Sequence, residues 1–419
     1  MFETSIKDQN TVEIEATGLS SDGSGVGRDE SGLTTFVFGL LPGEIGLIEI
    51  VERKKKWQRG ELKKILRPNP YRISPPCSVF GACGGCQLQH MSYEETLKWK
   101  KIWVEEALRR IGKLNLDEIK VHSTLGMDNP WRYRNKARLH VDREGKIGYY
   151  QQKTKTSIEF SDCLLISERM KGWIKSAKDN LKNHQPNIFS EGFNLTWREN
   201  KNGEGLLVIE RTNDNGWFKA IEPNGLFELK GDIPGSGLKG MGQDSLSGTK
   251  EGAYFTENIL GLNYRVSPLS FLQVNSIQTE ILYKKALEYA ALTGKETVFD
   301  LYCGIGTMTL HFARKARKTI GIEENPYAVG DAKLNAKING IDNVRFIQGK
   351  AENQLAPLVK SGKKPDVIVL DPPRAGVDPK GLEQIIIASP KRIVYVSCDP
   401  GTLARDLGRL AEGGYTVKE

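Results

Sequence analysis

The first part of the chain, residues 4–67, alternates short apolar runs with glycine-rich turns. Apolar side chains recur at every second position in residues 12–15, 35–38 and 46–50, and a glycine-rich segment covers 23–27. Short strands of period two with frequent turns are typical of a small closed β-barrel. The pattern therefore predicts an OB-like barrel domain over residues 1–68, which ends in a proline-rich stretch.

The last third of the chain alternates apolar runs with amphipathic segments. Strand-like runs cover residues 297–303, 319–323, 344–348, 366–371 and 392–398, and helical patterns cover 307–314, 328–339 and 379–387. Strands that alternate with helices indicate a doubly wound parallel sheet. We therefore predict an α/β domain of the Rossmann-like class over residues 271–419.

The residues between these two parts mix both patterns. Residues 94–111 have the apolar spacing of an amphipathic helix, and mixed strands run from about 131 to 270. We predict a central α+β module over residues 69–270, but its strand order does not follow from the sequence.

Charge and hydropathy narrow the class of protein. The 419 residues include 60 Lys and Arg against 52 Asp and Glu, for a net charge of +8. The chain has no apolar run of about 18 residues and a polar beginning, so we expect a cytoplasmic protein without a membrane partner. Nothing in the sequence indicates an oligomer, and we expect a monomer.

The basic residues are concentrated in one stretch. Residues 51–72 hold nine basic side chains and two acids, interleaved with Trp57 and Tyr71. This stretch is either a surface for a polyanion such as RNA or a solvated linker.

A turn after the strand-like run 298–303 contains Gly304 and Gly306. Glycines in such a turn let the backbone approach an adenosine-bearing cofactor closely. Glu323 ends the next strand, nineteen residues beyond Gly304, where an acid accepts hydrogen bonds from ribose hydroxyls. These residues predict a nucleotide site at the carboxyl edge of the sheet.

Six cysteines in a reducing compartment do not indicate disulfides. Cys77, Cys83 and Cys86 lie in a glycine-rich turn, and Cys163 lies far downstream. Thiolates in such a turn can bind one face of a metal centre with the remote cysteine as fourth ligand, and an iron–sulfur cluster suits this spacing better than zinc. The alternative is four buried, inert cysteines.

Cys398 lies between a strand-like run and a helical segment. A helix start or a nearby cation lowers a thiol pKa from about 8.5, so this cysteine is a candidate nucleophile. We expect Arg405 to supply the cation if the turn folds back. A buried cysteine at a strand end is the alternative for Cys398, and packing is the role we expect for Cys303.

Four cations recur at every second position of residues 131–138. This spacing places them on one face of a strand, where they could bind RNA phosphates. An exposed charged strand without a ligand is the alternative. The four are Arg132, Arg134, Lys136 and Arg138.

The motifs and their order resemble the RNA uridine-5-methyltransferase family over essentially the whole chain. The barrel resembles a TRAM domain, and with the four cysteines it is most similar to members that act on 23S rRNA. The resemblance is carried by residues 77–86, Asp162-Cys163, Phe271-Leu272-Gln273-Val274-Asn275, Asp371-Pro372-Pro373-Arg374-Ala375-Gly376, and Ser397-Cys398-Asp399-Pro400 with the helix start that follows.

The resemblance implies two cofactors. The first is S-adenosyl-L-methionine, with contacts implied for Gln273, Tyr302, Glu323 and Asp371. The second is a 4Fe-4S cluster on the four cysteines Cys77, Cys83, Cys86 and Cys163.

The resemblance also implies that Cys398 is the nucleophile. C5 of uracil is too poor a nucleophile to take a methyl group unaided, but thiolate addition at C6 makes an enolate with electron density at C5. The expected activity is therefore methylation of C5 in a uridine that is flipped out or lies in a loop.

The chain departs from the family pattern in places. Thr307 stands where members often have Asn, and Lys350 where they have an acid or amide. The family's proton-abstracting Glu lies farther from the nucleophile than the twenty-one residues that follow Cys398, so we assign no base. We expect residues 415–418 to leave an incomplete sheet edge, in either a fragment or a truncated protein.

Other activities remain open. The same chemistry could act on tRNA. Synthesis of 5-methylcytidine is disfavoured because Arg374, and not a second cysteine, follows the prolines, and methylation of a base amino group needs no nucleophilic cysteine. An RNA-binding protein without turnover is the non-enzymatic alternative.

Overall fold

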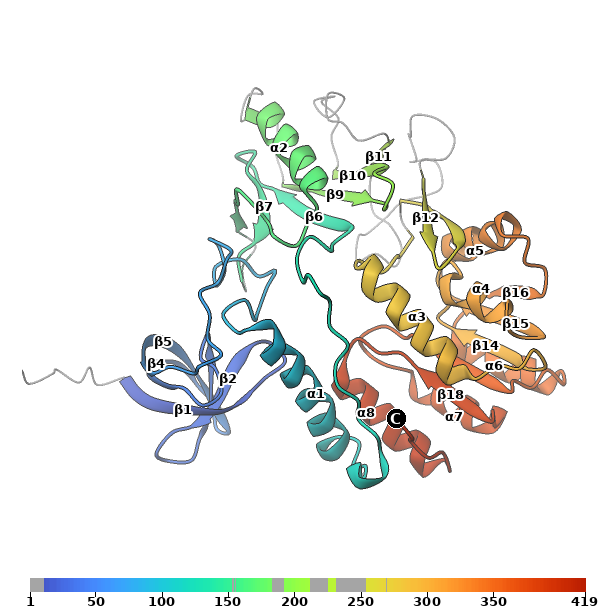
Figure 1. Ribbon diagram of the computed structural model, residues 1–419, viewed down its shortest axis with the longest axis horizontal. Coiled ribbons are helices and arrows are strands. Elements are labelled where there is room, and N and C mark those ends of the chain that lie inside the picture. The colour runs from blue at the N-terminus through green and yellow to red at the C-terminus, as the bar shows by residue number, and fades with distance from the viewer. Residues whose placement is uncertain are drawn as a thin grey trace, which may run out of the picture. The chain divides into compact units, whose positions relative to one another are not determined.

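The computed structural model describes residues 11–152, 154, 156–182, 192–211, 225–230, 254–268 and 270–419 (Figure 1). The chain forms two compact units. Unit 1 comprises Met1–Glu106, Val121–Gly126 and Tyr149–Phe160, and unit 2 comprises Ala107–Lys120, Met127–Gly148 and Ser161–Glu419. Within the described part of the chain, no helix has both the length and the apolar character needed to cross a bilayer.

Unit 1 contains a closed five-stranded barrel, as predicted. Its strands follow the order β1-β2-β3-β5-β4, and its core holds Ile14, Val37 and Ile48. The strands are β1 (Thr11–Leu19), β2 (Ser24–Arg28), β3 (Thr34–Phe38), β4 (Ile45–Arg53) and β5 (Trp57–Arg67).

Most of the basic stretch 51–72 lies in strands, because residues 51–53 end β4 and residues 57–67 form β5. The interpretation of the stretch as a linker is therefore wrong for these residues. β5 runs parallel to β3 and antiparallel to β4, and thereby closes the barrel. Gly60 is required where β5 crosses β4, because a Cβ there would lie 2.0 Å from Cγ2 of Ile48. The cations of β5 are thus carried on a rigid barrel wall.

A buried ion pair ties the barrel to the segment that follows it. Arg72 donates two hydrogen bonds of 2.6 Å to the carboxylate of Glu44, which also accepts the N–H groups of Leu41 and Asn69. Burial alone would raise the pKa of Glu44, but these hydrogen bonds outweigh it and lower the pKa. The carboxylate therefore stays ionised inside the unit.

A long helix, α1 (Tyr93–Arg110), follows this segment at the predicted place. Trp99 and Trp103 of α1 pack against Leu19 and Met91, and the Trp103 indole donates a 2.6 Å hydrogen bond to the carbonyl of Leu19. The helix thus closes one side of the core of unit 1.

A mixed sheet in unit 2 corresponds to the predicted central α+β region. Its strands follow the order β11-β10-β9-β6-β7, and the last residues of β7 pair with β8 in unit 1. A short hairpin of β12 and β13 follows. The elements are η1 (Leu116–Glu118), β6 (Lys136–Val141), β7 (Ile147–Tyr150), β8 (Ser157–Ile158), α2 (Glu168–Lys182), β9 (Phe193–Glu199), β10 (Gly205–Arg211), β11 (Gly225–Lys230), β12 (Phe255–Ile259) and β13 (Leu262–Val266).

The predicted doubly wound sheet is confirmed in the last third of the chain. Five parallel strands follow the order β16-β15-β14-β17-β18. The elements are α3 (Ser276–Ala290), β14 (Thr297–Leu301), α4 (Thr307–Ala313), β15 (Lys318–Glu323), α5 (Pro326–Ile338), β16 (Val344–Gln348), α6 (Ala351–Lys360), β17 (Val367–Leu370), α7 (Pro379–Ala388), β18 (Arg392–Tyr395) and α8 (Pro400–Glu412).

Helices cover both faces of this sheet because alternate residues of its strands point to opposite sides. Val298 of β14 packs in a core with residues of α3, α4 and α5. Phe299 and Leu301 of the same strand pack with residues of α6, α7 and α8. The strand order reverses between β14 and β17, and ligands of such sheets bind at the carboxyl ends of the strands that flank this switch point.

The segment that follows α8 lies beside the sheet without forming a strand. Residues 415–418 have no strand pairing, and β18 is the outermost strand on that side. The Tyr415 hydroxyl donates to the carbonyl of Pro390, and the carbonyl of Lys418 accepts from the N–H of Lys120.

Candidate functional site

The carboxyl ends of β14, β17 and β18 bring three segments to one edge of the sheet. The N–H of Asp371 reaches the carbonyl of Leu301 at 3.4 Å, and the N–H of Val396 reaches that of Leu370 at 2.7 Å. The parallel ladder thus continues one residue beyond each strand. The glycine turn after β14, Asp371 after β17 and Cys398 after β18 therefore leave the sheet side by side.

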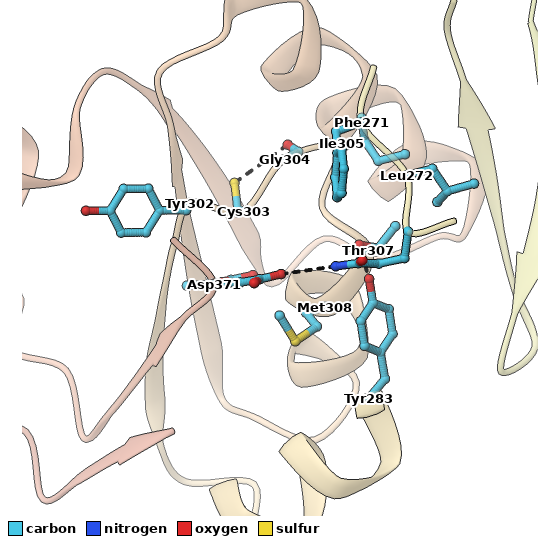
Figure 2. Close-up of a pocket in the computed structure, with 12 residues that line it drawn as sticks. Phe271, Leu272, Tyr283, Tyr302, Cys303, Gly304, Ile305, Thr307, Met308 and Asp371 are labelled. Carbon is cyan, nitrogen blue, oxygen red and sulfur yellow. Dashed lines mark hydrogen bonds between the residues drawn. The ribbon is translucent and has the colours of Figure 1, made fainter. Parts of the chain in front are cut away.

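A cleft that opens to solvent lies at the end of β14, and its empty space together with the solvent at its mouth is about 370 Å³. Of the predicted cofactor residues, Gln273, Tyr302, Gly304 and Asp371 line it (Figure 2). The complete lining is Phe271, Leu272, Gln273, Tyr283, Asp300, Tyr302, Cys303, Gly304, Ile305, Thr307, Met308 and Asp371.

The glycine turn that borders the cleft has an unusual backbone. Tyr302, Gly304 and Gly306 all have positive φ, at 69°, 55° and 82°. A Cβ at Gly306 would also lie 3.0 Å from the ring of Phe346. Glu323, the predicted ribose acceptor, fixes this turn, because its carboxylate accepts the Gly304 N–H at 3.0 Å and the Asn325 N–H at 2.9 Å.

The aromatic ring of Tyr302 faces away from most of the other lining residues. It packs against the core that contains Leu301 and Val377, and in Figure 2 it points to the side opposite Phe271 and Leu272. The pocket is therefore bordered by the backbone of Tyr302 more than by its phenol.

Two carboxyl groups with raised pKa values line the cleft. Burial raises the pKa of Asp371 to about 6, and its Oδ2 accepts a long, 3.5 Å hydrogen bond from the Gln273 amide. Asp300 is fully buried, and burial, helped by the charges of Asp371 and Glu323, raises its pKa to about 7. Both groups change charge near neutral pH.

Asp300 was not predicted as a site residue. Its Oδ2 accepts a 2.5 Å hydrogen bond from Thr309, whereas its Oδ1 is buried and has no hydrogen-bond partner among the described residues. An acid in the middle of the apolar run 298–301 was the signal, because buried strands rarely contain an unpaired charge.

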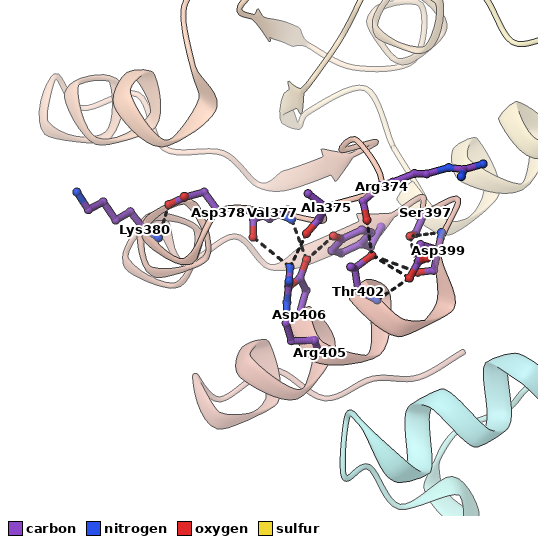
Figure 3. A network of polar contacts seen from close by, with 11 residues as sticks. Arg374, Ala375, Val377, Asp378, Lys380, Ser397, Asp399, Thr402, Arg405 and Asp406 are labelled. Carbon is purple, nitrogen blue, oxygen red and sulfur yellow. Dashed lines mark hydrogen bonds and ion pairs between the residues drawn. The ribbon is translucent and has the colours of Figure 1, made fainter. Parts of the chain in front are cut away.

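Cys398 is exposed in the turn between β18 and α8, so the alternative of a buried cysteine is wrong. Asp399 caps α8 by accepting the N–H of Thr402 at 2.9 Å, and Ser397 bonds to the backbone of Asp399 (Figure 3). These local hydrogen bonds fix the turn on both sides of the sulfur. Cys303, in contrast, is buried, and burial raises its thiol pKa well above the ordinary value, as its predicted packing role requires.

Arg405 binds the loop after β17 instead of facing Cys398 as we expected. Its guanidinium donates to the fully buried carboxylate of Asp406 and to the carbonyl of Ala375. Asp406 also accepts the Val377 N–H at 2.8 Å and the Tyr395 hydroxyl at 2.7 Å (Figure 3). This network joins β18, α8 and the loop that begins at Asp371.

The prediction that four cations share one strand face is wrong for Arg132. β6 begins at Lys136 and carries Lys136 and Arg138, and Arg134 lies just before it, where it forms isolated bridges to Ile166 and Asn275. Arg132 has a φ of 56°, which no strand residue adopts.

The guanidinium of Arg132 is committed to protein acceptors. It binds the carboxylate of Asp162 at 2.7 and 2.9 Å, that of Glu168 at 2.7 Å, and the carbonyls of Cys163 and Ile166. The sequence spacing could not show these partners, because they lie some thirty residues downstream.

The four predicted cluster ligands lie in both units. Cys77, Cys83 and Cys86 belong to unit 1 and Cys163 belongs to unit 2, and all four are partly exposed without forming disulfides. The Gly85 N–H donates to the sulfur of Cys83 at 3.4 Å. Across the described residues, however, no three Cys, His, Asp or Glu side chains are grouped so that they could hold a metal ion.

Two known families match the two ends of the chain. Residues 256–418 match the family described as tRNA (Uracil-5-)-methyltransferase, and residues 9–63 match the TRAM domain. The first match covers the doubly wound sheet together with the β12–β13 hairpin, and the second covers the barrel.

Curated relatives match over nearly the full length. A protein of Clostridium acetobutylicum named an uncharacterized RNA methyltransferase is 39% identical, and the match covers 99% of this chain and 94% of that protein. A Bacillus cereus protein with the same name is 40% identical over 97% of this chain and 92% of its own length.

Among solved structures, a Pyrococcus abyssi tRNA (uracil-54, C5)-methyltransferase in complex with S-adenosyl-L-homocysteine has a similar fold. The TM-score is 0.73 with 24% sequence identity, and the match covers 94% of this chain and 92% of that one.

The Asp406 network gives a prediction about stability. Asp406→Ala should lower the free energy of unfolding of unit 2 by about 3 kcal/mol or more, because it leaves Arg405, Tyr395 and the Val377 N–H without their buried acceptor. Urea denaturation followed by far-UV circular dichroism measures the change. Glu383→Gln, at an exposed position of α7, is the control and should change stability little. Equal midpoints for the two variants would contradict the role of the network.

Proposed function

This chain belongs to the RNA (uracil-5-)-methyltransferase family, and we propose that it transfers a methyl group from S-adenosyl-L-methionine to C5 of a uridine through a covalent bond to Cys398. The observation that carries this proposal is the exposed sulfur of Cys398 at the same sheet edge as the acid-lined cleft. A nucleophile and a nucleotide pocket at one edge are what the reaction requires.

The residues of the cleft fit S-adenosyl-L-methionine. This cofactor carries two positive groups, the sulfonium and the α-ammonium, and Asp300 and Asp371 offer carboxyl oxygens to them. Glu323 retains further lone pairs for ribose hydroxyls. When bound, the cofactor supplies the electrophilic methyl group.

The remaining steps begin at Cys398. The thiolate of Cys398 adds to C6 of the uracil, and the electron pair of the C5–C6 double bond moves toward the C4 carbonyl oxygen. C5 then takes the methyl group. Loss of the C5 proton to a base restores the double bond and expels the thiolate. The turn fixed by Ser397 and Asp399 holds the sulfur in place during these steps.

The RNA class is a further part of the proposal. The barrel and the four cysteines resemble members that act on 23S rRNA, and we propose that substrate for a monomeric, cytoplasmic enzyme. The family description and the Pyrococcus abyssi protein favour tRNA as the second candidate. Methylation assays with unmodified 23S rRNA and tRNA in parallel distinguish the two.

We propose that RNA phosphates contact Lys136 and Arg138 on β6. Arg138 is exposed, and the two side chains point to the same side of the strand. Arg132 is excluded from this proposal because its donors bind Asp162 and Glu168.

The 4Fe-4S cluster is a proposal that rests on the spacing of Cys77, Cys83, Cys86 and Cys163. The N–H bond to the sulfur of Cys83 supports it, since such bonds accompany cluster thiolates. Across the described residues no three candidate ligands are grouped for a metal ion, and we assign no catalytic step to the cluster.

The nucleophile is tested with RNA that contains 5-fluorouridine. Fluorine at C5 cannot leave as a proton does, so with S-adenosyl-L-methionine the wild-type protein should form a persistent adduct that resists denaturing electrophoresis. Cys398→Ala should abolish the adduct and leave the affinity for S-adenosyl-L-homocysteine nearly unchanged. A wild-type protein that binds RNA but forms no adduct would support the RNA-binding alternative instead.

The acid pair predicts a pH dependence of cofactor binding. Both carboxyls are neutral below their pKa values of about 6 and about 7 and charged above them, so only the higher pH offers two anions to a cationic ligand. The affinity for S-adenosyl-L-methionine should rise about tenfold or more between pH 5.5 and 8. Calorimetry in buffers of different ionisation enthalpy should show proton release on binding. S-adenosyl-L-homocysteine, which lacks the sulfonium, should show a flatter profile, and equal profiles would refute the assignment.

The cluster predicts an iron content. Anaerobically purified wild-type protein should be brown and contain about four irons per chain. Cys83→Ser should lose most of this iron, whereas Cys398→Ser, a matched change at the nucleophile, should keep it. An iron content that is unchanged in Cys83→Ser, or an absence of iron from the wild-type protein, would refute the cluster assignment.

A further inference from the structure

A buried pair of hydroxyl groups closes the cleft on the side of α3 and α4. The phenol oxygen of Tyr283 lies 2.7 Å from Oγ1 of Thr307, and both residues line the pocket (Figure 2). Tyr283 is 3% exposed, so its hydroxyl is withdrawn from bulk water. The cofactor proposal above does not use either hydroxyl.

Either hydroxyl of this pair could donate to the other, and only one direction leaves a proton for a ligand. Burial raises the pKa of Tyr283, so its phenol keeps its proton and is able to donate it to Thr307 Oγ1. Tyr264 is engaged elsewhere, since its own hydroxyl donates to the backbone carbonyl of Thr307 at 2.9 Å. With Tyr283 as the donor, the hydroxyl proton of Thr307 is available to a group in the cleft.

The place of the pair indicates which part of the cofactor it would meet. Glu323, the proposed ribose acceptor, is the last residue of β15. The pair lies with Gln273, Asp371 and Asp300 in a compartment whose lining does not include Glu323. This compartment is left for the amino-acid end of the cofactor. Its two acids suit the ammonium. Among the described residues its lining includes no Lys or Arg, so what it offers to the carboxylate are neutral donors.

We propose that Tyr283 is a positioning residue that directs the Thr307 hydroxyl toward the α-carboxylate of the cofactor. The proposal rests on the methyltransferase function stated above and deepens it. Thr307 makes the contact, and Tyr283 acts through Thr307 by fixing the rotation of its side chain.

Two ligands separate this role from a merely structural one. S-adenosyl-L-homocysteine carries the amino-acid end, and 5′-methylthioadenosine lacks it. Tyr283→Phe should lower the affinity for S-adenosyl-L-homocysteine about threefold to tenfold, the range for one neutral hydrogen bond. It should leave the affinity for 5′-methylthioadenosine unchanged. Thr307→Val should have the same or a larger effect, and Thr307→Ser, which keeps the hydroxyl, should restore most of the affinity.

Two further variants complete the experiment. Tyr283→Phe combined with Thr307→Val should be no worse than Thr307→Val alone, because the phenol acts through the threonine. Tyr264→Phe is the matched control, since it removes a buried phenol hydroxyl that contacts the backbone of the same residue. It should leave the ratio of the two affinities unchanged.

The outcomes are distinct. Equal losses for both ligands in Tyr283→Phe, or no loss for either, would overturn the positioning role. A wild-type protein that binds neither ligand would overturn the proposed function itself, and with it the role of Tyr283, which depends on that function.

Discussion

The site depends on the parallel pairing of β14, β17 and β18. Because neighbouring strands run in the same direction and in fixed register, their carboxyl ends lie at one edge, and whatever follows each strand is delivered there. Leu301, Leu370 and Tyr395, the last residues of the three strands, are register partners. The glycine turn, Asp371 and the turn with Cys398 therefore all begin at the same level of the sheet. A slip of one residue in β18 would turn the side chains after it to the opposite face. The positions of these groups are thus set by the backbone hydrogen bonds of the sheet.

The same edge concentrates negative charge. Asp300 and Asp371 line one cleft, and burial raises the pKa of both. Glu323 binds the glycine turn that borders this cleft, and its charge adds to the rise at Asp300. Such an arrangement costs stability in the ligand-free protein, since like charges repel and a buried carboxyl lacks water. A cationic ligand relieves both effects, so binding and ionisation are coupled in this pocket.

Much of the fold could be predicted from the sequence because its periodicity is strong. The strand 344–348 was predicted at its observed limits, and the barrel and the sheet of alternating strands and helices were recognised. α3 was missed because its buried face consists of Thr279, Tyr283, Ala286 and Ala290, which do not form an apolar stripe. α6 was missed because it contains Pro357, a residue that usually ends a helix.

The candidate site was predictable only where a residue's role is local. Gln273, Gly304 and Asp371 line the cleft, whereas the partners of Arg132 and Arg405 come from distant segments that no spacing rule reveals. Asp300 was overlooked for a related reason. Its significance comes from what surrounds it in space, and a strand pattern records only what lies next to it in sequence.

Arg132 also decides the shape of the loop that carries Cys163. Its guanidinium donates to the carbonyls of Cys163 and Ile166 and pairs with Asp162 and Glu168. One side chain thus holds this loop at several points along its length. The loop therefore behaves as a single unit, and its points of attachment would be lost together, not one by one.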